Sequence, residues 1–189
     1  IIPEMVTGAQ LDLELLQTSK RFPALPDSSA TLGTNATTTL GYNGALMWGP
    51  TLIMNKGDYV QLNVKNSLDQ STSPLLRTTT TTVHWHGFHI PAIMDGGPHQ
   101  TVPGGTTWSP RFTVKNDAAL YWYHPHVHGL AELALLGGGR GALVVDGIEN
   151  VQPAVQGLEQ KILVIGDQAQ VQGLGEGPGN CGVDIPFQD

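Results

Sequence analysis

The sequence has little of three things: cysteine, charged residues and long apolar runs. Cys181 is its only cysteine, so a disulfide within the chain is excluded. Lys and Arg together number 9, the net charge is -7, and no basic stripe occurs, so we expect no nucleic-acid partner. No apolar run approaches the length of a membrane span, so we expect no membrane association.

Glycine and proline are abundant, at 24 and 13 residues, while 40% of the chain is hydrophobic. That composition is too apolar for a disordered chain and suits short strands joined by tight turns. A length of 189 residues predicts one domain or slightly more. The chain begins at Ile1 rather than Met, which fits a processed product and predicts a secreted or periplasmic location.

Alternating apolar residues predict several strands. Leu11, Leu13 and Leu15 alternate with polar residues, and Val60, Leu62 and Val64 do the same within 57–68. Further strands are expected within 41–52, 78–88, 99–114, 118–126 and 141–147, with a short helix within 129–139. The threonines from 78 to 82 are interpreted as strand with a solvated outer face. The sequence therefore predicts an all-β sandwich or barrel.

The last part of the chain follows a different pattern. Residues 149–159 are predicted to be a linker, and the apolar run 161–168 a strand without a partner in this chain. An unpaired strand leaves its backbone groups unsatisfied unless another sheet takes it up. We therefore expect a first domain over 1–148 and an incomplete second domain over 160–189.

Histidines form two clusters. Three His-x-His pairs occur, whereas random placement of the histidines predicts about 0.2. Residues i and i+2 of a strand share a face, so His84 with His86, and His124 with His126, can direct four imidazoles to one place. Imidazole suits Zn, Cu, Fe and Ni, and the general affinity order favours copper(II). The spacing leaves open whether one ion or more is bound.

The remaining histidines, His89, His99 and His128, are interpreted as non-ligands. His89 and His128 are candidates for packing around the site or orienting its ligands. A cupin also uses His-x-His, but its pattern requires a Glu a few residues later, where this chain has Ile90 and Pro91. The cupin interpretation is therefore disfavoured.

Two longer segments resemble a known family. "HWHGFHIPAIMDGGPHQTVPGG" (84–105) and "YWYHPHVHGLAELALLGGGRGALVVDG" (121–147) resemble the first copper-binding half of multicopper oxidases, in particular the laccase-like and bacterial copper-efflux branch. The resemblance covers about residues 40–170. It implies an all-β, cupredoxin-like Greek-key β-sandwich, followed by the first strand of a second cupredoxin domain.

The resemblance also implies a chemistry. Members of the family oxidise a substrate by one electron at a time at a blue (type 1) copper, and a trinuclear copper cluster reduces dioxygen to water. By resemblance, His84 is a ligand of the type 2 copper, and His86, His124 and His126 are ligands of the type 3 pair. Asp95 resembles a carboxylate that helps to deliver protons near the cluster. Its alternative role is that of a turn-forming Asp before two glycines.

The chain departs from the family in one respect. A blue copper requires a Cys with two His, but Cys181 follows every histidine, and the family's second pair of histidine motifs is absent. We therefore expect a companion polypeptide with the C-terminal cupredoxin domains, or a further segment of the same protein if this chain is a fragment, to supply the type 1 copper and the other half of the cluster. Dioxygen and a small reducing substrate would be the other partners.

Three functions remain open. The first is a laccase-like oxidase acting on phenols, amines or metal ions. The second is a copper- or zinc-binding carrier or storage module without turnover. The third, a mononuclear zinc hydrolase, needs a general base, and no well-placed Glu is evident.

Overall fold

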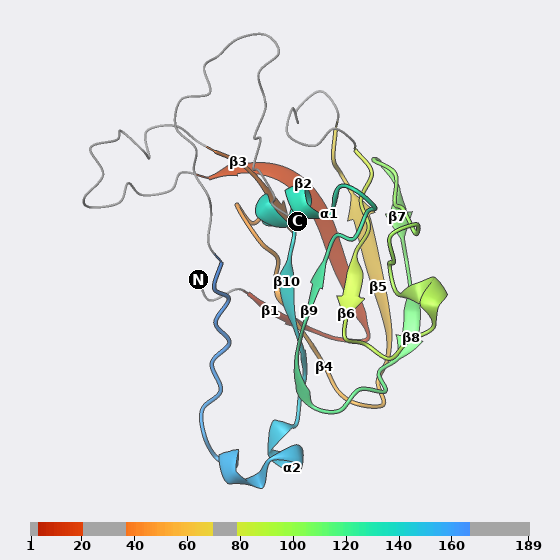
Figure 1. The fold of residues 1–189 in the computed structure, drawn as a ribbon. Helices are drawn as coiled ribbons and strands as arrows, with labels where there is room; N and C mark the ends of the chain where they lie inside the picture. The colour runs from red at the N-terminus through yellow and green to blue at the C-terminus, as the bar shows by residue number, and fades with distance from the viewer. Residues whose placement is uncertain (1–3, 21–36, 70–78, 167–189) are drawn as a thin grey trace, which may run out of the picture.

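The computed structural model describes residues 4–20, 37–69 and 79–166, and the strands within these ranges form two sheets (Figure 1). Sheet A has the order β1 (Met5–Thr7), β4 (Thr51–Met54), β10 (Gly141–Val145), β9 (Ala119–His124) and β6 (His84–His86). Sheet B has the order β3 (Thr37–Tyr42), β2 (Gln10–Lys20), β5 (Tyr59–Asn66) and β7 (Thr107–Trp108), and β8 (Arg111–Thr113) also pairs with β5. The predicted all-β sandwich is confirmed.

The pairing within sheet A brings the two histidine motifs together. β10 is parallel to β4 and antiparallel to β9, and β6 adds to the other side of β9 as an antiparallel strand. In sheet B, β2 is parallel to β5 and antiparallel to β3. Because β6 lies at the end of sheet A, its histidines are next to His124 of β9 and are covered by no further strand of that sheet.

The core forms between the two sheets, and its residues follow the predicted alternation. Every second residue is buried in the first half of β2 and along β5. These side chains pack against buried residues of sheet A: Leu11, Leu13, Leu15, Val60, Leu62 and Val64 from sheet B, with Leu52, Tyr123 and Leu143 from sheet A. Burial of apolar surface is the main force that holds the sheets together. This core gives β6 and β9 a rigid base.

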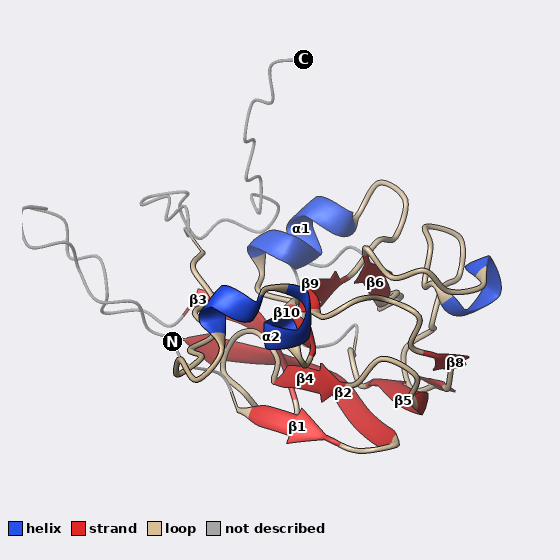
Figure 2. Ribbon diagram, turned by 90° about the horizontal axis from the view of Figure 1, so that it is seen from below, coloured by secondary structure: helices blue, strands red, loops and turns tan. Residues whose placement is uncertain are grey.

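The helices are short and lie outside the sheets. They are η1 (Ala92–Met94), α1 (Ala131–Leu136), α2 (Ile148–Val151) and η2 (Pro153–Val155), and α1 confirms the helix expected within 129–139. α1 and α2 lie at opposite ends of the molecule in Figure 1, and Figure 2 shows α1 clear of the strands. None of the helices in the described ranges is long and apolar enough to cross a membrane.

The threonine run differs from the prediction. Instead of one strand over 78–88, the described part contains β6 and an isolated pairing of Thr81 with Val102. Thr81 and Thr82 are buried, so the expectation of a solvated outer face is wrong. Their hydroxyls are satisfied inside the protein, because Thr81 Oγ1 donates to the carbonyl of Thr82, and Thr82 Oγ1 accepts from the amide of His126.

The end of the described chain joins neither sheet as a strand. α2 and η2 fall within the predicted linker, and residues 161–166 form no strand. Leu163 and Ile165 are 64% and 90% exposed. The rest of the predicted strand and Cys181 lie outside the described residues. The start of a second domain near residue 160 therefore stays a prediction.

Candidate metal centre

β6 presents its two histidines on one side of sheet A. The strand is three residues long, and its central residue, Trp85, is fully buried in the core. The indole Nε1–H of Trp85 donates to the carbonyl of Met94 at 3.1 Å, which anchors the strand from behind. Because side chains alternate along a strand, His84 and His86 point away from the core.

The register between β6 and β9 places the second motif beside the first. His84 is opposite His124, and His86 is opposite Trp122. Trp122 stacks on the His124 ring, with 4.1 Å between the ring centroids and 27° between the planes. His126 follows two residues after the end of β9, beyond Pro125, which cannot donate a ladder hydrogen bond.

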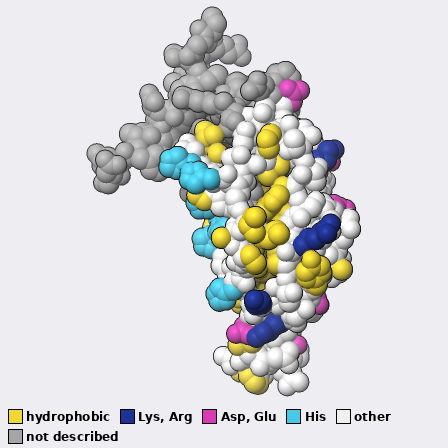
Figure 3. Space-filling view, turned by 90° about the vertical axis from the view of Figure 1, so that its right-hand side faces the viewer, with side chains coloured by type: hydrophobic (Ala, Val, Ile, Leu, Met, Phe, Trp, Pro, Cys, Tyr) yellow, Lys and Arg dark blue, Asp and Glu magenta, His cyan; other side chains and the backbone are white. Residues whose placement is uncertain are grey.

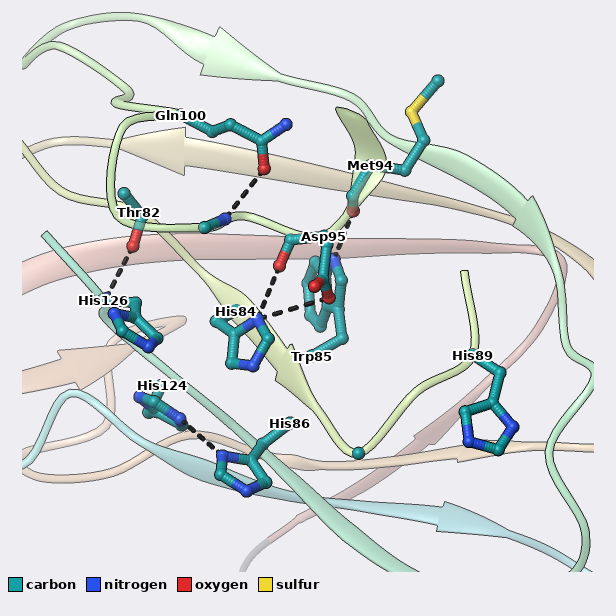
Figure 4. Close-up of polar contacts among 12 residues, drawn as sticks. Thr82, His84, Trp85, His86, His89, Met94, Asp95, Gln100, His124 and His126 are labelled. Atoms are coloured by element: carbon teal, nitrogen blue, oxygen red, sulfur yellow. Dashed lines mark hydrogen bonds and ion pairs between the residues drawn. The ribbon is translucent and has the colours of Figure 1, made fainter. Parts of the chain in front are cut away.

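The four histidine rings converge, as Figure 4 shows. The His84 ring centroid lies 5.6 Å from that of His86, 5.4 Å from that of His124 and 5.2 Å from that of His126. The centroids of His124 and His86 are 5.3 Å apart, and those of His124 and His126 are 5.7 Å apart. His89 lies apart from this group in the same view. We call these four residues the histidine cluster.

Three members of the histidine cluster have nitrogens close enough for a shared ion. One ring nitrogen from each of His84, His86 and His124 lies within 4.8 Å of the others. His124 is buried, His84 is half-buried and His86 is exposed. His126, also half-buried, adds a fourth ring next to those of His84 and His124, so four imidazoles are available to bind metal.

Backbone carbonyls determine which ring nitrogen of His84 and of His124 is free to bind a metal. His84 Nδ1 is 2.8 Å from the carbonyl oxygen of Asp95, and His124 Nδ1 is 2.8 Å from that of Pro125. A carbonyl oxygen only accepts hydrogen bonds, so each Nδ1 carries the hydrogen and each Nε2 keeps a lone pair. His124 Nε2 lies 3.1 Å from His86 Nδ1, and a bound ion would replace the hydrogen bond between them. Such carbonyl contacts are the usual means of orienting metal-binding histidines.

Burial keeps His124 neutral. Loss of solvation is the largest cause, and together with the charges of the neighbouring histidines it lowers the pKa of His124 from an ordinary 6.5 to about 4, against the opposing effect of the Pro125 carbonyl. A neutral imidazole has the lone pair that a metal requires, so His124 is ready to bind metal at neutral pH without first losing a proton.

Asp95 lies directly beside His84. Its Oδ1 is buried, 3.2 Å from His84 Nδ1, and makes no hydrogen bond, because the Nδ1 hydrogen is directed at the Asp95 carbonyl. Burial raises the pKa of the Asp95 carboxyl, and the charges of the nearby histidines oppose this shift. The amide of Asp95 donates to the carbonyl of Ala92 and ends η1, which agrees with the turn-forming interpretation, whereas the proton-delivery role of Asp95 stays a prediction.

The glycine after Asp95 permits this contact. Gly96 has a φ of +65°, and a Cβ there would lie 1.8 Å from the carbonyl oxygen of Val83, the residue before β6. Any other residue would push the Asp95 loop away from His84.

Two residues that support the histidine cluster were missed by sequence reasoning. Thr82 Oγ1 accepts the amide hydrogen of His126 at 2.6 Å. Buried Asn116 accepts the His89 amide hydrogen with its Oδ1 and donates with its Nδ2 to the carbonyl of Gly87, both at 2.8 Å, so it clamps the loop after His86. Neither residue carries a motif, and no signal in the sequence links Asn116 to that loop.

The histidine cluster on a two-sheet β-sandwich defines a class: a β-sandwich protein with a histidine site suited to a transition metal. A family model described as "Multicopper oxidase" matches residues 26–150. The chain therefore belongs to the multicopper oxidase family, and copper is the metal that the family implies.

Several relatives agree with this membership. "Multicopper oxidase mco" of Staphylococcus aureus is 38% identical over 138 residues, which cover 72% of this chain and 29% of that protein. "Copper resistance protein A homolog" of Pseudomonas syringae pv. tomato is 34% identical over 150 residues, covering 78% of this chain and 21% of that protein. The chain thus spans less than a third of the length of these relatives.

Solved structures show the same fold. A bacterial laccase-like multicopper oxidase from Ochrobactrum sp. matches with a TM-score of 0.66 and 28% identity, over 80% of this chain and 31% of that one. A multicopper oxidase from Campylobacter jejuni, described as a metallo-oxidase, matches with a TM-score of 0.58 and 27% identity. The match covers 77% of this chain and 30% of that one. The cupredoxin-like sandwich implied by the resemblance is thereby confirmed for the described strands.

Proposed function

We propose that this chain is the N-terminal part of a laccase-like oxidase, which couples one-electron oxidation of a small reducing substrate to the reduction of dioxygen to water. The observation that carries the proposal is the histidine cluster, with neighbouring ring centroids between 5.2 and 5.7 Å apart. Phenols, amines and low-valent metal ions are the substrate classes in question. The structural relative from Ochrobactrum sp. has oxidase activity towards lignin model compounds, which supports the phenolic class.

The residues of this chain would hold copper in an orientation set in advance. His84 and His124 would bind through Nε2, because their Nδ1 atoms are engaged by carbonyls, and His86 would bind through Nδ1, which faces His124. We assign His84 to the type 2 copper, and His86, His124 and His126 to the type 3 pair. Bound copper would supply the one-electron redox chemistry, and rigid strands would keep the ions at constant separation.

Asp95 is proposed to deliver protons during the reduction of dioxygen. Reduction of one dioxygen to two waters consumes four electrons and four protons, so a group that takes up and releases protons is required at the site. The buried Oδ1 of Asp95 has no hydrogen bond and lies 3.2 Å from His84 Nδ1. A carboxyl whose pKa is raised by burial holds a proton more readily at this place than an exposed one does.

A companion segment is proposed to complete the site. His86 is exposed, and histidines gather along one edge of the molecule in Figure 3. The exposed apolar Leu163 and Ile165 would pack in a second cupredoxin domain. We propose that this companion carries the type 1 copper and the opposite half of the cluster. A secreted or periplasmic location stays a prediction from the sequence.

A carrier or storage module without turnover is the second candidate. The observation that favours it is the group of three nitrogens within 4.8 Å, which can hold a single copper or zinc ion without any further domain. This function would need neither Asp95 nor a blue copper.

One experiment separates the two candidates. The natural protein that carries this chain is purified and loaded with copper, and metal content, paramagnetic resonance and oxygen uptake with a phenolic donor are measured. An oxidase takes up oxygen and loses this activity in His84→Ala and His126→Ala, whereas His89→Ala, outside the cluster, retains it. Metal binding without oxygen uptake indicates the carrier. Oxygen uptake that survives both cluster variants contradicts the ligand assignment.

A further inference from the structure

His99 and His128 form a second histidine pair, separate from the histidine cluster. Their ring centroids are 6.0 Å apart, and the ring planes are inclined by 32°. Neighbouring rings of the cluster are only slightly closer, at 5.2 to 5.7 Å. Sequence spacing gave no reason to pair these two residues, because His99 stands alone between the two motifs.

The backbone holds both residues of the pair in place. The His128 amide donates to the carbonyl of Pro98, next to His99, at 3.4 Å. The turn that carries His99 is closed twice by Gln100, whose amide donates to the Gly97 carbonyl and whose Oε1 accepts the Gly97 amide hydrogen. Two rings on closed turns lose less conformational freedom when they bind an ion than rings on free loops.

The nitrogens of this pair are available for a ligand. Both side chains are exposed, and neither ring makes a hydrogen bond through its nitrogens to any residue in the described part of the chain. The 6.0 Å separation of the rings allows one ion to bind a nitrogen of each at about 2.0–2.1 Å after small side-chain rotations. Water would complete the coordination, so such an ion would exchange easily.

We propose that His99 and His128 form a surface site for an exchangeable transition-metal ion, with copper(II) preferred over nickel and zinc. The preference follows from imidazole chemistry and the general affinity order of divalent metals. His128 follows His126 by two residues, so its Cα is at most about 7 Å from that of His126. An ion on the pair would therefore be held beside the histidine cluster. Metal binding at this site requires no oxidase turnover, so this proposal is independent of the proposed oxidase function.

The test uses the natural protein that carries this chain, loaded with copper and then freed of loosely bound metal. Copper(II) is titrated into the parent protein, His99→Ala, His128→Ala and the double variant, with calorimetry and paramagnetic resonance as readouts. We expect the parent to bind one further copper(II) with two imidazole nitrogens. Each single variant should bind it about tenfold or more weakly, because one imidazole no longer chelates. The double variant should bind the further copper(II) only slightly more weakly than either single variant, because the two residues act on the same ion.

His89→Ala is the matched control, because His89 is also exposed but lies outside both groups. It should bind the further copper as the parent does. The proposal is overturned if the parent takes up no further copper, or if the parent, His99→Ala and His128→Ala bind it equally. Far-UV circular dichroism should match in all variants, since neither ring packs in the core.

Discussion

Thr82→Val tests whether a buried hydroxyl positions the second histidine motif. Thr82 is fully buried, and its Oγ1 accepts the amide hydrogen of His126 at 2.6 Å. Valine has nearly the same shape as threonine but offers no acceptor. The substitution leaves the core filled and removes one hydrogen bond, at the residue proposed as a copper ligand.

The expected magnitude follows from this geometry. An amide that loses its partner in a partly buried place costs about 1–2 kcal/mol of unfolding free energy, since water reaches it only in part. For a chain of this size, that loss corresponds to a fall in melting temperature of roughly 2–8 °C. His126 would also be held less firmly, and loss of such a supporting contact typically weakens metal affinity by roughly 10- to 100-fold.

Two measurements check this prediction. Thermal unfolding of the copper-free protein gives the stability, and competition with a copper chelator gives the affinity. Thr82→Ser keeps the hydroxyl and should retain most of the affinity, and Thr113→Val, on the exposed face of β8, should change neither quantity. The reasoning is refuted if Thr82→Val and Thr82→Ser show the same melting temperature and the same copper affinity.

Three further predictions concern the surroundings of the histidine cluster. Asn116→Ala removes the partners of the His89 amide and the Gly87 carbonyl, and should destabilise the protein by about 2–4 kcal/mol in urea unfolding, whereas an unchanged midpoint would contradict the clamp. Gly96→Ala should lower both thermal stability and copper content, because its Cβ meets the backbone just before β6; wild-type values for both would show that the loop adjusts freely. The copper-free protein should lose about 1–3 kcal/mol as the pH falls from 6.5 to 4, because unfolded His124 takes up a proton there that the folded form, with its pKa lowered to about 4, does not. Urea unfolding at pH 7, 5.5 and 4.5 measures this loss, and an equal loss in His124→Gln would assign it to other groups.

Much of the fold was predictable because its signals are local. Alternation at Leu11 to Leu15 and at Val60 to Val64 predicted β2 and β5, since a half-buried strand must place every second side chain in the core. The threonine run misled, because β-branched residues indicate strand propensity but not which face is buried. Buried Thr82 accepts, through Oγ1, the amide hydrogen of His126, a partner that is distant in sequence.

The sequence by itself determined the membership of the chain in its family and the residue types of its site. Two His-x-His motifs are local patterns, and the two-residue period of a strand is enough to put each pair on one face. Only the tertiary structure decided that the pairs meet, through the antiparallel register of His84 with His124. It also decided that the Asp95 carbonyl orients His84, that Asn116 clamps the loop after His86, and that His99 lies against His128. These contacts join segments far apart in the chain, and packing of the two sheets, not local propensity, brings such segments together.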